Sequence, residues 1–167
     1  MKSILTRFLA IILACSIFGC SATSHDGAQF VGQQAPLARI TLLDGTAVSL
    51  QQYYGKTVAL IFWATTCSKS KQALPRIAEF AEKFVNRSDV IFLATSLDKL
   101  ENLDELKNRI GILHSKKIQY AFSGNEANDE AFQIFDGGEI PYFIVIEPKG
   151  KVIAAGLDDR IIYQTIH

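Results

Sequence analysis

The chain has 167 residues, of which 49% are hydrophobic and 20% are charged. This size and composition fit one globular domain with its own hydrophobic core, and they exclude a disordered chain or a protein with many membrane spans. Seventeen basic residues balance seventeen acidic ones, so there is no net charge to attract nucleic acid, and we expect no nucleic-acid partner.

The first nineteen residues have the order of an export signal. Lys2 and Arg7 give a positive start, residues 8–18 are an apolar core, and a small residue precedes Cys20. The apolar core is too short to span a bilayer comfortably. We therefore interpret residues 1–19 as a signal peptide, and we expect the mature chain on the extracytoplasmic side of a bacterial cell envelope.

The four residues that end at Cys20 resemble a bacterial lipobox, whose cysteine is lipidated after cleavage. The resemblance implies a membrane anchor on Cys20. Cys15 is a competing lipidation site, although it leaves a shorter apolar core before it. Ordinary secretion, an uncleaved anchor and a buried amphipathic helix are the other interpretations. If cleavage precedes Cys20, Cys67 is the single unmodified thiol of the mature chain, and no internal disulfide can form.

Two features come before the central part of the chain. Residues 20–34 are polar and contain glycine, which predicts a flexible tether ahead of a folded domain at 35–167. Within that domain, residues 39–50 place an Asp44-Gly45 turn between two short apolar runs, which predicts a β-hairpin.

The pattern of the central stretch changes at Cys67. Residues 58–63 are an unbroken apolar run of strand length, which is typical of a strand buried on both faces. The change of pattern places Cys67 at the start of a helix. Unpaired amides and the helix dipole at that position favour a thiolate over a thiol, and Lys69 and Lys71 add positive charge nearby. The helix is predicted from apolar residues at spacings of three and four: Leu74, Ile77, Ala78, Ala81, Phe84 and Val85.

These residues resemble the thioredoxin superfamily and, within it, the membrane-tethered TlpA- and ResA-like proteins. Their pattern reads F-W-A-T-W-C-x-x-C-K-x-E-x-P, and this chain matches it at Phe62, Trp63, Ala64, Thr65, Cys67, Lys71 and Pro75. The resemblance covers roughly residues 35–157. It implies an α/β, thioredoxin-like fold, with a mixed central sheet flanked by helices and an added N-terminal hairpin.

The departures from that pattern concern proton acceptors and the second thiol. Thr66 stands in place of the second tryptophan, Ser70 in place of the resolving cysteine, and Ala73 in place of an acid. Ile61 occupies the position at which thioredoxin buries an aspartate. The chain therefore has a C-x-x-S site without the expected acids.

The next segments predict the rest of a βαβ arrangement. Residues 90–94 form a second buried strand, parallel to the first, so Thr95, Ser96 and Asp98 should share a sheet edge with Cys67. A helix is predicted from Leu103, Leu106, Ile110 and Leu113, followed by a short strand or extended link at 118–122. Ser123 to Glu126 fits a capping box for a helix that runs to Phe135, with Ala127, Ala131, Phe132 and Phe135 turned inward.

The last part of the domain predicts an antiparallel hairpin. Residues 142–146 and 152–155 are apolar runs around a proline- and glycine-containing turn. Before them, Ile140-Pro141 resembles the cis-proline loop of the superfamily, which implies that the backbone of Ile140 lies opposite Cys67 and can pair with an extended peptide. A short terminal helix is predicted within 158–167.

The functional hypothesis is single-cysteine thiol–disulfide exchange or reduction, with Cys67 and Ser70 as catalytic residues. The Ser70 hydroxyl can stabilise a Cys67 thiolate but cannot release a mixed disulfide, so an external thiol must do so. We expect substrate contacts from Trp63, Thr66, Ile140 and Pro141.

Exported thiol or disulfide proteins and a low-molecular-weight thiol are the expected partners. No cofactor is implied, and no residues lie at metal-binding spacing. A non-catalytic thioredoxin-fold binding or chaperone-like module and an inert Cys67 are the alternatives. Peroxide reduction is disfavoured because Leu60 and Ala64 replace the peroxiredoxin proline and threonine.

Overall fold

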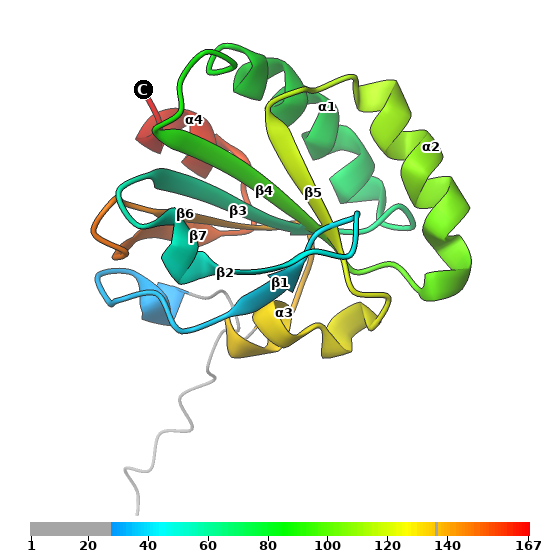
Figure 1. Cartoon of the computed structure of the whole chain (residues 1–167), viewed down its shortest axis with the longest axis horizontal. Helices are drawn as coiled ribbons and strands as arrows, with labels where there is room; N and C mark the ends of the chain where they lie inside the picture. Colours follow the sequence, from blue (N-terminus) through cyan, green and yellow to red (C-terminus); the bar gives the residue numbers. More distant parts are fainter. Residues whose placement is uncertain (1–27, 136) are drawn as a thin grey trace, which may run out of the picture.

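The computed structural model of the protein describes residues 28–135 and 137–167 (Figure 1). The predicted signal peptide, residues 1–19 with Cys15, and the predicted lipidation site Cys20 lie outside these residues. No helix in the described ranges is both long and apolar enough to cross a membrane.

A mixed five-stranded sheet forms the centre of the domain, with the strand order β5-β4-β3-β6-β7. Strand β3 is parallel to β4, and β4 is parallel to β5, whereas β6 is antiparallel to both β3 and β7. A separate hairpin of β1 and β2 precedes the sheet. The strands are β1 (Arg39–Thr41), β2 (Ala47–Ser49), β3 (Thr57–Trp63), β4 (Val90–Ser96), β5 (Ile118–Phe122), β6 (Tyr142–Ile146) and β7 (Val152–Gly156).

Helices cover both faces of this sheet (Figure 1). Helices α1, α2 and α4 lie on one face, and the β1–β2 hairpin and α3 lie on the other. The α-helices are α1 (Ser68–Glu82), α2 (Leu103–Leu113), α3 (Glu130–Ile134) and α4 (Arg160–Thr165), and short 3-10 turns occupy Ala28–Phe30, Leu50–Tyr53, Leu100–Asn102 and Glu126–Asn128.

Strand β3 forms the middle of the core because its side chains alternate between the two faces. Ala59, Ile61 and Trp63 pack on the side of α1, and Val58, Leu60 and Phe62 pack on the opposite side. All six are buried. An unbroken apolar run is therefore required at this strand, as its sequence indicates.

The structure corrects two helix boundaries. The predicted capping box at Ser123 is wrong: α3 begins only at Glu130, because the Asp129 carboxylate accepts a hydrogen bond from the Phe132 amide at 3.1 Å. Ala127 is exposed, in contrast to the buried residues of α3. Helix α1 ends at Glu82, so Val85 lies beyond it and is 46% exposed rather than turned inward.

The described part of the predicted tether is held on the sheet. The Gly32 amide donates to the Val152 carbonyl at 2.8 Å, and the Val152 amide donates to the Gln33 carbonyl at 2.9 Å. Residues 28–34 therefore cover the start of the β7 edge instead of forming a flexible tether.

Replacement of Leu106 by alanine should destabilise the domain, because this leucine of α2 is 0% exposed and alanine would leave a cavity. We expect a loss of about 3 kcal/mol in the free energy of unfolding, measured by chemical denaturation. The matched control is Ile112→Ala on the same helix, where the side chain is 58% exposed. This control should change stability by no more than about 0.5 kcal/mol, and equal losses in both variants would contradict the assigned packing of α2.

Candidate active site

Cys67 lies at the junction of β3 and α1. It is the N-cap residue of α1, with extended backbone angles, and its side chain is partly exposed. The first turn of α1 contributes no acidic residue. This position gives the sulfur both access to solvent and the amide groups of a helix start, which favour a negative charge.

A buried carboxylate fixes the loop that carries Cys67. Asp98, 2% exposed, follows β4 and accepts hydrogen bonds from the Thr65 amide at 3.0 and 3.1 Å. It also accepts from the Thr65 hydroxyl at 2.6 Å and from the Ser96 hydroxyl at 2.7 Å. The predicted rim residues Ser96 and Asp98 thus act on the loop two residues before Cys67, which holds the start of α1 against the end of β4.

Ser70 is completely buried on the inner side of the cysteine. Its hydroxyl accepts a long hydrogen bond from the Ala64 amide, at 3.4 Å. Partial burial raises the pKa of the Cys67 thiol. Hydrogen bonds from the Ser70 hydroxyl and from the amides of Ser70 and Lys69, with the positive charge of Lys69, outweigh this effect and lower the pKa below its ordinary value of 9.0.

The peptide bond between Ile140 and Pro141 is cis, as the resemblance implies. The Cys67 Sγ donates to the Ile140 carbonyl oxygen at 3.4 Å. This contact exists only in the thiol form, whereas the contacts with Ser70 and Lys69 stabilise the thiolate. Deprotonation of Cys67 therefore releases the Ile140 carbonyl, and the released carbonyl becomes available to an amide of an approaching peptide.

The other predicted substrate-binding residues separate into two groups. Thr66 is exposed beside Cys67, the Ile140 carbonyl faces the sulfur through the contact just described, and Pro141, which follows it, is buried. Trp63 is different, because it is 1% exposed and packs beneath the site in the core around α1. Trp63 therefore offers almost no surface to a ligand in this structure, and its part in substrate binding stays a prediction.

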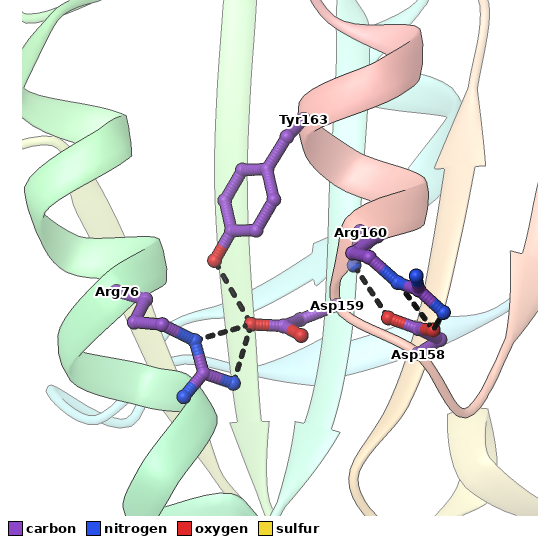
Figure 2. Close-up of polar contacts among 5 residues, drawn as sticks. All are labelled: Arg76, Asp158, Asp159, Arg160 and Tyr163. Atoms are coloured by element: carbon purple, nitrogen blue, oxygen red, sulfur yellow. Dashed lines mark hydrogen bonds and ion pairs between the residues drawn. The ribbon is translucent and has the colours of Figure 1, made fainter.

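A pocket that the sequence did not predict lies beside the cysteine. It has a volume of about 550 Å³, and residues of α1, Pro141 and the turn after β7 line it. Arg76 forms its outer wall and is held by Asp159, which contacts Nε at 2.9 Å and Nη2 at 2.8 Å (Figure 2). The Tyr163 hydroxyl donates to the same carboxylate oxygen at 3.0 Å.

This cluster joins α1 to the end of the chain. Burial and the neighbouring Asp159 carboxylate raise the pKa of Tyr163 to about 12, so the hydroxyl keeps its proton at neutral pH. Arg160 pairs separately with Asp158 on the outer side of α4 (Figure 2). In the sequence, the spacing of Lys69, Gln72 and Arg76 indicates that they share one face of α1, which is the face that lines the pocket. Nothing in the sequence indicates Asp159 as the partner of Arg76.

Within residues 28–135 and 137–167, no group of three or more histidine, cysteine, aspartate or glutamate side chains could hold a metal ion. The described site brings together one thiol, one buried hydroxyl and the backbone of a cis-proline loop.

Comparison with known proteins places these features in a family. The family model described as AhpC/TSA matches residues 31–155. The thiol-disulfide oxidoreductase ResA of Bacillus cereus is 26% identical over 159 residues, which cover 90% of this chain and 85% of ResA. The thioredoxin-like protein YneN of Bacillus subtilis is 37% identical over 71 residues, and the match covers 42% of each chain.

A solved structure supports the architecture. The thioredoxin domain of a thiol-disulfide oxidoreductase from Bacteroides vulgatus superposes with a TM-score of 0.69 at 24% identity, over 81% of this chain and 94% of that domain. The C-terminal domain of a similar protein from Bacteroides thetaiotaomicron gives a TM-score of 0.69 at 20% identity, over 81% of this chain and 93% of that domain. The thioredoxin-like fold, with its mixed sheet, flanking helices and N-terminal hairpin, is thereby confirmed.

Replacement of Ser70 by alanine should raise the pKa of Cys67, because the variant loses the hydroxyl that helps to stabilise the thiolate. Only the thiolate reacts with iodoacetamide, so a lowered pKa places the rise in alkylation rate at lower pH, and Ser70→Ala should move that rise to higher pH. The measurement is the alkylation rate of the peptide that carries Cys67, followed by mass spectrometry across pH. Ser68→Ala, at an exposed position of the same turn, is the control, and coincident curves for Ser70→Ala and the wild type would contradict the assigned role of Ser70.

Proposed function

The protein belongs to the AhpC/TSA family, and from this premise we propose that it is a thiol–disulfide oxidoreductase that works through a single cysteine, Cys67. The observation that carries the proposal is the placement of this sulfur. It is partly exposed at the start of α1, its pKa is lowered, and it faces the Ile140 carbonyl at 3.4 Å. A poised and accessible thiolate of this kind is what attack on a disulfide requires.

The first step is exchange. The Cys67 thiolate attacks one sulfur of a substrate disulfide, a new S–S bond forms to Cys67, and the second substrate sulfur leaves as a thiolate with the electron pair of the broken bond. Ser70 contributes a hydrogen bond to the attacking form, and the positive charge of Lys69 adds to it. The cis-proline loop offers the Ile140 backbone to the chain on either side of the substrate sulfur.

Release of the product needs a second thiol from outside the chain. Ser70 occupies the position from which a cysteine would attack the mixed disulfide, and an oxygen cannot replace the sulfur in that step. When an external thiolate attacks the substrate sulfur, a new S–S bond forms between those two sulfurs and Cys67 leaves as the thiolate with the electron pair of the broken bond. When it attacks the Cys67 sulfur instead, the substrate leaves as a thiolate and Cys67 stays joined to the external thiol until a second external thiolate attacks that thiol's sulfur. The partners are accordingly thiol or disulfide proteins and a low-molecular-weight thiol.

A binding module is the second candidate, and the buried Ser70 hydroxyl is the observation that favours it. Because no second sulfur ejects the product, a mixed disulfide with a partner protein persists until another thiol arrives. In this alternative the site holds an exported partner through the groove beside Pro141 and does not turn over.

We place the protein in the bacterial cell envelope, on the extracytoplasmic side, with a lipid anchor on Cys20. The order of charge, apolar core and small residue before Cys20 supports this proposal, and so does the need for a disulfide-permissive compartment. Lipidation would keep the domain at the membrane surface, in a compartment where disulfides form.

The test of the activity compares three forms of the full chain: the wild type, Cys67→Ser and Ser70→Cys. The wild type should reduce 2-hydroxyethyl disulfide when glutathione is supplied, and Cys67→Ser should have no activity above the uncatalysed rate. Ser70→Cys restores a second sulfur three residues after Cys67, so it should release bound product without glutathione in a single turnover. Stoichiometric trapping of the wild type without any turnover would favour the binding module, and an unreactive Cys67 would refute both proposals.

The anchor has a separate test. Expression of the full chain in a bacterium, followed by mass spectrometry of the mature N-terminal peptide, should show acylated Cys20 and no residues before it. Cys20→Ser should abolish the lipid mass, whereas Cys15→Ser should leave it unchanged. Loss of the lipid in Cys15→Ser alone would assign the anchor to the competing site, and an unmodified N-terminus in the wild type would refute lipidation.

A further inference from the structure

The pocket beside Cys67 carries an unbalanced charge. Lys69, Gln72 and Arg76 project from one face of α1 into its wall, and Asp158 and Asp159 come from the turn before α4. Each of the two acids is already paired with an arginine, Asp159 with Arg76 and Asp158 with Arg160. Lys69 forms no ion pair within the ranges that the structure describes, so it is the pocket cation whose charge no carboxylate already offsets.

Arg76 is held in a binding orientation without a ligand. Asp159 engages its Nε and Nη2 groups, and Tyr163 braces the same carboxylate. The third nitrogen of the guanidinium group points away from Asp159 (Figure 2). A fixed guanidinium group loses little side-chain entropy when a carboxylate binds, which makes it a better anion ligand than a mobile one.

The rest of the pocket is apolar and reaches the cis-proline loop next to Cys67. Pro141, Phe143 and Leu157 line it, and Pro141 follows the Ile140 carbonyl that contacts Cys67 Sγ at 3.4 Å. Lys69 is two residues from Cys67, and Arg76 is seven residues further along the helix. At 1.5 Å per residue those seven residues span about 10 Å, which is about the length of an extended tripeptide.

We infer that this pocket binds the carboxylate-bearing arm of a cysteine-containing substrate whose sulfur reacts with Cys67, with Lys69 and Arg76 as the carboxylate ligands. The inference rests on the proposed function, since it names the substrate class of the same thiol. Exchange then proceeds as described above, and the pocket holds the arm attached to the sulfur that joins Cys67. A tripeptide thiol of the glutathione type and an acidic segment of a protein present the same chemistry.

The experiment measures selectivity rather than activity alone. The rate constant for mixed-disulfide formation at Cys67 is determined in the full chain with glutathione disulfide, which carries carboxylates, and with neutral 2-hydroxyethyl disulfide. The ratio of the two constants reports carboxylate recognition, because a change in the nucleophilicity of Cys67 affects both reactions. Mass spectrometry of the peptide that carries Cys67 keeps the other cysteines of the chain out of the measurement.

Arg76→Gln should lower this ratio by about fivefold, the value for one partly exposed ion pair. Lys69→Gln should lower the ratio by a similar factor, and it should also slow both reactions because its charge stabilises the thiolate. Higher ionic strength should reduce the wild-type ratio toward that of the variants. Lys69→Gln also provides a test that does not depend on the contact between α1 and α4, if Arg76→Gln fails to fold.

Two matched controls remove the same charge from nearby positions. Lys71→Gln changes an exposed lysine of α1, and Lys83→Gln changes the exposed lysine at the C-terminal end of the same helix; neither residue lines the pocket. Both should keep the wild-type ratio. An equal decrease in these controls would show a general charge effect and would overturn the inference.

A second pair of substrates identifies the source of the carboxylate. Disulfides of a blocked cysteine hexapeptide with either glutamate or glutamine two residues from the cysteine are compared with the first pair. If the rate ratio of the glutamate peptide to the glutamine peptide is the larger, the pocket is assigned to acidic protein segments. If the rate ratio of glutathione disulfide to 2-hydroxyethyl disulfide is the larger, the pocket is assigned to a free low-molecular-weight thiol.

Both results support carboxylate recognition, whereas ratios near one in both pairs would overturn it. If neither neutral disulfide reacts with Cys67, the proposed function itself fails. That outcome is distinct from reaction without selectivity, which refutes the inference alone.

Discussion

The site depends on one buried carboxylate. Asp98 is removed from water, and it remains tolerable there because both oxygens accept hydrogen bonds from Thr65 and Ser96. These hydrogen bonds offset the cost of removing the carboxylate from water. Their geometric effect is to join the end of β3 to the end of β4 just before Cys67.

Because that loop is fixed, the thiol and thiolate forms of Cys67 have different hydrogen-bond partners. The thiol donates to Ile140, and the thiolate is stabilised by Ser70, by the amides at the start of α1 and by Lys69. The cis-proline loop thus holds the resting form, and the helix start holds the reactive form. Ser70 keeps a hydrogen-bond donor at the place where the resembling proteins have a second cysteine. In the proposed exchange this removes the sulfur that would release the product, so attack and release belong to different molecules.

Local patterns predicted much of this arrangement. The apolar run of β3 and the change of period at Cys67 indicated the strand and helix α1, and the motif around Pro141 indicated the cis bond only through resemblance. The start of α3 was missed because Ser123 and Asp129 are both good N-cap residues, and the choice between them depends on which residues the sheet buries. The motif that contains Trp63 does not show which face of the strand this residue occupies, and in the structure it packs in the core around α1. The pairing of Arg76 with Asp159 had no signal, since the two residues are far apart in the chain and ion pairs leave no periodic pattern.

The last helix gives this distant ion pair its importance. Helix α4 has six residues, far fewer than an isolated helix needs for stability in water, so its position depends on tertiary contacts. Ile162 and Ile166 supply them by packing into the core around α1, and Asp159 supplies another by binding Arg76 of α1. The same contacts that hold the end of the chain against the sheet also orient a guanidinium group beside the cysteine. The turn before α4 therefore lines the pocket while α4 itself packs on the core, so a change in the fit of α4 would alter both the packing and the pocket.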